Sequence, residues 1–122
     1  MNGKELLKID FRNGRVKGTV EMLEFKEGDS FIVYSPSLQL SSYGPSKQES
    51  HEMMKEVLND YCTNLIDAGP EQAFFELKKL GWKQHKFFKK RFLDPPYVDI
   101  NGILREFNLS EATEVKREVV SI

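Results

Sequence analysis

The residue types best suited to chemistry gather in one stretch of the chain, residues 77–93. This stretch carries seven cationic side chains and no acidic one, and its aromatic residues are Trp82, Phe87, Phe88 and Phe92. Cations that neutralise phosphates, beside aromatic rings on which bases stack, are the chemistry of single-stranded nucleic-acid binding. The cationic candidates for contact with nucleic acid or with a protein partner are Lys78, Lys79, Lys83, Lys86, Lys89, Lys90 and Arg91.

The same stretch has a simpler interpretation, which we favour. The aromatic rings would face the core, and the lysines would form a solvated face. The whole chain carries a net charge of −1, so the residues outside 77–93 carry −8 in total. That acidity argues against a general nucleic-acid-binding protein. An acidic protein partner, or an acidic patch of a second subunit, would use the same lysines.

The other reactive side chains form no catalytic or cofactor-binding pattern. His51 and His85 are the only histidines, and neither has a serine or cysteine partner at a telling spacing. The serines lack a G-x-S-x-G elbow, and the glycines form no phosphate loop. Cys62 is expected to be a small buried hydrophobe, and no cysteine–histidine cluster has zinc spacing. We predict no catalytic residue, no metal and no cofactor, and hence no enzyme.

Length and composition favour one domain spanning residues 1–122. The single cysteine excludes an internal disulfide. The N-terminus has no apolar signal region, and no run approaches the ~20 apolar residues of a membrane span. We therefore expect a soluble, cytoplasmic protein that does not bind membranes.

The clearest structural element is a helix over residues 47–67. Ser46 stands at the N-cap position and Glu49 follows three residues later, which is the spacing of a capping box. Apolar residues then recur at helical spacing, and Gly69 and Pro70 end the helix.

The residues before this helix predict an antiparallel meander of three or four strands. We expect strands at 5–11, 16–26, 31–35 and 38–41, with Asn13-Gly14 favouring a type I′ turn. In the second strand the apolar phase shifts by one residue at Leu23 and Phe25. Either both faces of the sheet are covered there, or a bulge flips the register.

The remaining residues, 69–122, form a C-terminal extension. Pro70 suits the first turn of a second helix, which Gly81 would end. Residues 82–93 fit either a strand or a short helix. Residues 100–109 predict a helical turn or two, and the valine-rich residues 114–122 predict a final strand at a sheet edge.

A resemblance to a known family covers residues 16–66. An acidic glycine turn, a Pro-x-Leu strand and a Gly-x-Ser-x-x-Glu turn that opens a long helix are together similar to the HicB family of antitoxins. Ser50 replaces the alanine that is usual in that family. The residues that carry the resemblance are Glu27-Gly28-Asp29, Tyr34-x-Pro36-x-Leu38 and Gly44-x-Ser46-x-x-Glu49-Ser50.

The resemblance implies a small β-meander with a helix on it, similar to a truncated RNase H sheet. It also implies a homodimer and a small toxin-like protein partner, because HicB proteins usually neutralise the RNA-cleaving toxin HicA. Many members add a C-terminal DNA-binding domain, but residues 69–122 contain no convincing recognition helix.

An RNase H-like sheet invites a search for carboxylates that converge on a metal. Glu21 and Glu24 differ by three along a strand, so alternation places them on opposite faces. Asp29 lies in a turn and Glu49 belongs to the capping box, and Asp60 is the remaining candidate; no paired-carboxylate geometry is implied. We therefore predict no nuclease site.

These observations predict an α+β fold, with an antiparallel sheet and the helix 47–67 across one face. The favoured function is a non-catalytic HicB-like interaction module, an antitoxin or an orphan relative of one. The alternative is a nucleic-acid-binding regulator that uses residues 78–92. The predicted core is Val20, Met22, Phe31, Val33, Leu38, Leu40, Met54, Leu58, Tyr61, Cys62, Leu65, Phe74 and Leu77.

Overall fold

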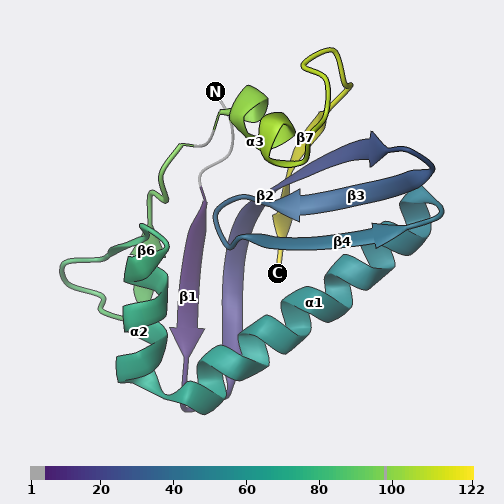
Figure 1. The fold of residues 1–122 in the computed structure, drawn as a ribbon. Helices are drawn as coiled ribbons and strands as arrows, with labels where there is room; N and C mark the ends of the chain where they lie inside the picture. The colour runs from purple at the N-terminus through teal and green to yellow at the C-terminus, as the bar shows by residue number, and fades with distance from the viewer. Residues whose placement is uncertain (1–4, 98) are drawn as a thin grey trace.

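The residues that the structure describes form a seven-stranded antiparallel sheet with three helices, so the predicted α+β class is confirmed (Figure 1). The computed structural model describes residues 5–97 and 99–122. The sheet order is β4-β3-β2-β1-β6-β5, and β7 pairs with β2 outside this path. The elements are β1 (Leu6–Asp10), β2 (Arg15–Glu27), β3 (Ser30–Ser35), β4 (Leu40–Gly44), α1 (Lys47–Ala68), α2 (Pro70–Lys79), β5 (Lys83–Gln84), β6 (Arg91–Leu93), α3 (Ile100–Glu106) and β7 (Lys116–Ser121).

The first four strands form the predicted meander, each paired with the next. The turn between β1 and β2 differs from the prediction. Gly14 has a φ of +65°, but Asn13 does not take the positive φ that a type I′ turn requires. Instead, the Asp10 carboxylate accepts hydrogen bonds from the backbone N–H of Asn13, at 3.2 Å, and from its side-chain amide, at 2.7 Å. A longer loop closed by this aspartate replaces the two-residue turn.

The shifted apolar phase of β2 arises because both faces of the sheet are covered. Val20 and Met22 belong to the main core, which lies under α1 and α2. Leu23 and Phe25 belong to a second cluster, with Ile103 and Leu104 of α3. Residues of opposite parity point to opposite faces of a strand, so a single strand serves both clusters without a register flip.

The helix α1 begins where the sequence predicts. The Ser46 hydroxyl accepts a hydrogen bond from the Glu49 N–H at 3.2 Å. The return bond from the Glu49 side chain to the Ser46 N–H is not formed among the described residues, so the capping box is only half right. Gly44 lets the helix approach β4, because a Cβ there would lie 2.6 Å from the Ser50 nitrogen.

The side chain at position 50 is fully buried beneath this turn. The Ser50 hydroxyl donates to the Lys47 carbonyl at 2.9 Å, and the Ser42 hydroxyl donates to the Ser50 carbonyl at 2.8 Å. A serine is therefore accommodated at this small, buried position, because its polar group is satisfied within the helix.

Replacing Ser46 with alanine is expected to lower the free energy of unfolding by about 0.5–2 kcal/mol, because the Glu49 N–H loses its acceptor. Urea unfolding followed by circular dichroism measures this loss. Ser46→Asp is the matched control, since aspartate also caps helices and should retain most of the stability. Equal stability of the alanine variant and the wild type would show that this cap contributes nothing.

Most of the predicted core is correct. The confirmed buried members are Val20, Met22, Val33, Leu38, Met54, Leu58, Leu65 and Leu77. Leu40, Tyr61 and Phe74 are partly buried against the core, and Cys62 is half-buried. Phe31 is wrong: it lies outside both clusters, where the Lys26 ammonium is 5.5 Å from its ring centroid. Leu38 is buried from the turn before β4, since that strand begins only at Leu40.

The C-terminal extension packs onto the meander. Residues 82–93, which the sequence left open, form the short hairpin of β5 and β6, and β6 pairs with β1. Trp82 and Phe92 join the main core, and the Trp82 indole N–H donates to the Ser37 carbonyl at 2.9 Å. The predicted final strand is also present: it is β7, and it pairs with β2 over residues 19–24. Among the described residues, no helix combines the length and apolar character needed to span a membrane.

Candidate functional site

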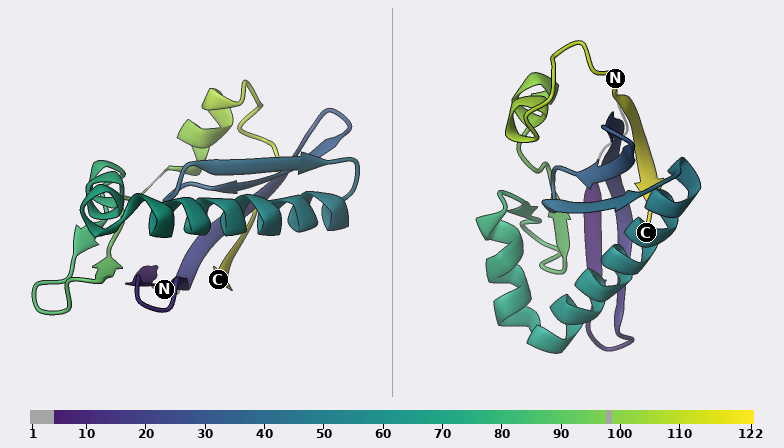
Figure 2. Two further views of the ribbon diagram at one scale, coloured as in Figure 1. Left: turned by 90° about the horizontal axis from the view of Figure 1, so that it is seen from below. Right: turned by 45° about the vertical axis from the view of Figure 1, so that its right-hand side comes forward.

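The loop between β5 and β6 stands away from the body of the protein (Figures 1 and 2). The strand β5 has only two residues and forms one end of the sheet order. In the left view of Figure 2 the hairpin extends beyond α2, on the opposite side from α3. We refer to residues 83–93 as the basic hairpin, and the candidate site is its loop.

The four aromatic residues of the stretch 77–93 divide into two pairs by their exposure. Trp82 is 2% exposed and Phe92 is fully buried, as the favoured interpretation of the sequence requires. Phe87 is 77% exposed and Phe88 is 56% exposed, so for these two rings that interpretation is wrong. The physical reason is position, because Trp82 and Phe92 lie where the hairpin meets the core. Phe87 and Phe88 lie in the loop beyond it.

The loop is held by hydrogen bonds within the hairpin. Gln84 donates its side-chain amide to the Lys89 carbonyl at 2.7 Å. The Arg91 N–H donates to the Phe88 carbonyl at 2.9 Å, and the His85 N–H donates to the Arg91 carbonyl at 2.7 Å. The exposed rings therefore lie in a loop whose two sides are joined by hydrogen bonds.

The predicted cationic residues occupy two places. Lys83, Lys86, Lys89, Lys90 and Arg91 lie on the basic hairpin itself, and the four lysines are exposed. Lys78 and Lys79 are also exposed, but they belong to the last turn of α2. The sequence grouped seven cations, and the structure brings five of them onto one hairpin.

Two of these cations lie against the exposed rings. The Arg91 guanidinium carbon is 4.5 Å from the centroid of Phe88, and the Lys86 ammonium is 5.8 Å from that of Phe87. Both separations lie within the range of cation–π attraction. Each ring therefore has a cation beside it, and the loop presents apolar surface and positive charge together.

The charge of the basic hairpin acts on the carboxyl of Asp10. Hydrogen bonds from Asn13 lower the pKa of Asp10, and the charge of Lys90 adds to this effect. The Ile9 N–H donates to the Lys90 carbonyl at 2.9 Å, which ties the hairpin to β1. The Asp10 carboxylate accepts its hydrogen bonds within its own turn, from Asn13.

The carboxylates considered for a metal site do not converge. Glu24 is 8% exposed and forms ion pairs with His51 and, at 3.7 Å, with Lys47. Glu21 pairs instead with Arg117 of β7, at 3.1 Å. Within residues 5–97 and 99–122, no group of three or more potential ligand residues could hold a metal ion.

The ion pairs determine the charge state of Glu24. Burial acts to raise the pKa of this carboxyl, but the hydrogen bond and charge of His51, helped by Lys47 and Lys116, outweigh burial and lower it. Glu24 is thus ionised at neutral pH and fastens α1 to β2. Because its partners Lys47 and His51 lie on α1, we interpret Glu24 as a structural residue.

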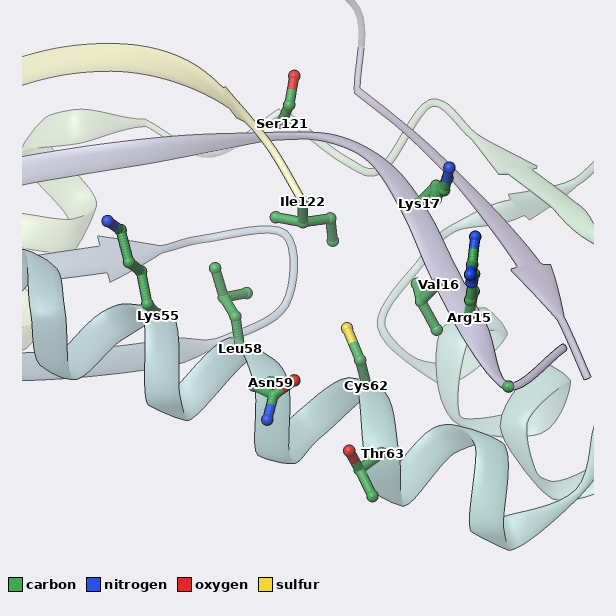
Figure 3. Close-up of a pocket in the computed structure, with 11 residues that line it drawn as sticks. Arg15, Val16, Lys17, Lys55, Leu58, Asn59, Cys62, Thr63, Ser121 and Ile122 are labelled. Carbon is green, nitrogen blue, oxygen red and sulfur yellow. The ribbon is translucent and has the colours of Figure 1, made fainter.

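A pocket of about 540 Å³ lies between α1, the start of β2 and the end of β7 (Figure 3). Its walls combine apolar residues such as Val16, Leu58 and Ile122 with the cations Arg15, Lys17 and Lys55. The Cys62 sulfur points into this space (Figure 3). Burial raises the pKa of the Cys62 thiol, and the residues lining the pocket include no histidine or carboxylate side chain to act as a base. The pocket therefore lacks the arrangement of a nucleophilic site.

Comparisons of the chain with protein-family models, with curated proteins and with solved structures gave no match.

Proposed function

We propose that the chain is a non-catalytic interaction module that binds single-stranded nucleic acid through the loop of the basic hairpin. The observation that carries the proposal is the exposure of Phe87 and Phe88 amid five cations, while the other two aromatic residues of the segment are buried. Exposed rings of this kind stack on unpaired bases, and the lysines contact phosphates.

The pairing of rings with cations is what favours nucleic acid as the ligand. Leaving two adjacent phenylalanine rings largely in water forgoes much of the favourable free energy of burial, which is about 1.5–3 kcal/mol for a side chain that becomes fully buried. Two adjacent exposed rings on one loop give an apolar surface on which a ligand can pack. Because no acidic residue interrupts residues 77–93, a polyanion meets no repulsion from that stretch.

The ligand is single-stranded because stacking needs the face of an unpaired base. In a duplex both faces of each base are already covered by neighbouring bases. An extended strand can place successive bases on Phe87 and Phe88 while its phosphates reach Lys86, Lys89 and Lys90.

A HicB-like module that binds a small toxin-like protein is the second candidate. What supports it is the meander of β1–β4 with α1 across one face, and the tight approach of Gly44 to Ser50 where α1 begins. The basic hairpin would then contact an acidic surface of the partner, or of a second copy in a homodimer. We expect either function to be performed in the cytoplasm.

The double variant Lys89→Glu/Lys90→Glu tests the proposal. Fluorescence anisotropy with labelled oligouridylate and oligothymidylate, each about 20 nucleotides long to exceed the site of a single binding module, measures affinity between low and moderate salt. The wild type is expected to bind with strong salt dependence. The variant should bind more weakly, with a slope of log K against log salt that is shallower by about 1.4, or about 0.7 for each phosphate that the lysines no longer neutralise.

Lys17→Glu/Lys55→Glu is the matched control for this experiment. It changes the net charge by the same amount, but both lysines line the pocket beside α1 rather than the basic hairpin. Equal losses of affinity in the two double variants would mean that binding follows net charge alone and would overturn the assignment to the hairpin. Failure of the wild type to bind either oligonucleotide would overturn the proposal. Recovery of one small protein from nuclease-treated lysate would then favour the second candidate.

A further inference from the structure

His85 forms the hydrogen bonds that shape the loop carrying the exposed rings. Its Nδ1 atom accepts hydrogen bonds from the backbone N–H groups of Phe87 and Phe88, each at 3.0 Å. An asparagine or aspartate side chain organises a turn in the same way, by accepting hydrogen bonds from backbone N–H groups of residues that follow it closely in the sequence. Two consecutive amides directed at one ring nitrogen require that nitrogen to be unprotonated.

The ring of His85 also packs beside the two phenylalanines. Ring centroids are 5.1 Å apart for His85 and Phe88, and 6.2 Å apart for His85 and Phe87. The Arg91 guanidinium lies near the Phe88 ring as well. One side chain therefore both fixes the backbone of the loop tip and contacts the rings that the tip presents.

We propose that neutral His85 is a positioning residue that latches Phe87 and Phe88 in their binding conformation, and that protonation of Nδ1 releases the latch. Binding of single-stranded nucleic acid at the basic hairpin is then lost on acidification. This inference deepens the proposed function and rests on it.

The release follows from the chemistry of imidazole. Protonation turns Nδ1 from an acceptor into a donor that faces two other donors. The amides of Phe87 and Phe88 then have no acceptor at this ring, and both hydrogen bonds become repulsive contacts. The latch is therefore released when the ring is protonated.

Other charged groups share this part of the molecule with His85. They come from the basic hairpin and from the last turns of α2, which packs against β5. These groups are Lys83, Lys86, Lys89, Lys90, Arg91, Glu76, Lys78 and Lys79.

A protonated His85 also adds a positive charge, which by itself would strengthen the attraction of phosphates. The two effects have opposite signs, so the direction of the pH dependence discriminates between them. A latch predicts weaker binding at low pH, whereas a simple additional cation predicts stronger binding.

Two substitutions separate the acceptor from the ring. His85→Asn places the amide oxygen Oδ1 where Nδ1 stands. The variant therefore retains a hydrogen-bond acceptor, and that acceptor does not become a donor when the pH is lowered. His85→Phe retains an aromatic ring but removes the acceptor. At about pH 7.5 we expect His85→Asn to bind labelled oligouridylate like the wild type, and His85→Phe to bind roughly tenfold more weakly.

At about pH 5.5 the wild type is expected to weaken toward the affinity of His85→Phe, while His85→Asn keeps its affinity. An asparagine variant as weak as the phenylalanine variant would overturn the inference. So would wild-type binding that strengthens on acidification. Circular dichroism at both pH values ensures that each variant remains folded.

A readout without nucleic acid separates this inference from the proposed function. The amide ¹H–¹⁵N signals of Phe87 and Phe88 are expected to shift together with the protonation of His85, and to remain constant with pH in His85→Asn. If no variant binds oligonucleotide but these signals shift, the latch holds and the proposed ligand is wrong. Signals that do not respond to His85 protonation would overturn the latch whatever the ligand is.

Discussion

Replacing Phe87 and Phe88 together with alanine is expected to weaken binding of single-stranded nucleic acid by about 30-fold to 10⁴-fold. Stacking of a base on an aromatic side chain contributes about 1–3 kcal/mol for each base, and the double variant removes both stacking platforms. Because these rings are 77% and 56% exposed, the substitution should leave the free energy of unfolding nearly unchanged. Anisotropy titration with oligouridylate measures the first quantity, and urea unfolding measures the second.

Phe75→Ala provides the matched control for this prediction. Phe75 is 59% exposed, so the control removes a ring of similar exposure from α2 rather than from the loop. It is expected to retain wild-type affinity. If the double variant binds as tightly as this control, the exposed rings are not stacking platforms, and the cations alone would have to explain any binding.

Replacing Trp82 with alanine is expected to lower the free energy of unfolding by about 3–5 kcal/mol. Trp82 is 2% exposed and belongs to the main core, so truncation leaves a large cavity. It also removes the indole donor from the buried Ser37 carbonyl, 2.9 Å away. The free energy of unfolding of a domain is only about 5–15 kcal/mol, so the variant is expected to lose a large part of it. Urea unfolding followed by circular dichroism measures the decrease.

Trp82→Phe divides this effect into its parts. Phenylalanine keeps most of the apolar packing but cannot donate to the Ser37 carbonyl, which leaves a buried acceptor unpaired. We expect stability lower than that of the wild type by about 1–3 kcal/mol, and higher than that of Trp82→Ala. A decrease below about 1 kcal/mol for Trp82→Ala would mean that the extension does not depend on this anchor.

Features encoded by neighbouring residues can be predicted from the sequence. The helix α1 is expected over 47–67 and spans Lys47–Ala68, because Ser46, the helical spacing of Met54, Leu58 and Leu65, and Gly69 all act locally. The meander is predictable for the same reason, since strand alternation and glycine turns are short-range signals. Even the half-formed capping box follows this pattern: the Ser46 bond depends on local backbone geometry, whereas the position of the Glu49 side chain does not.

The composition of the candidate site is also visible in the sequence, but its geometry is not. The cations of residues 77–93 stand out as a group. For His85, by contrast, the sequence predicts no role. Its spacing from other residues does not indicate that it accepts hydrogen bonds from two backbone amides of the same loop. The position of His85 two and three residues before the pair Phe87 and Phe88 is the local signal that could have suggested it.

The sequence by itself determined the α+β class, the helix α1, the meander and the cluster of positive charge, since each depends on residues close together in the chain. Only the tertiary structure decided which aromatic residues within 77–93 are buried. Trp82 and Phe92 reach the core because α2 leads into β5 and β6 pairs with β1, at the opposite end of the chain. Phe87 and Phe88 are left outside because they lie in the loop that joins β5 to β6, which stands away from the body of the protein. Whether a residue is buried depends on which elements pack against it. Such long-range contacts cannot be predicted from the spacing of residues that are close together in the sequence.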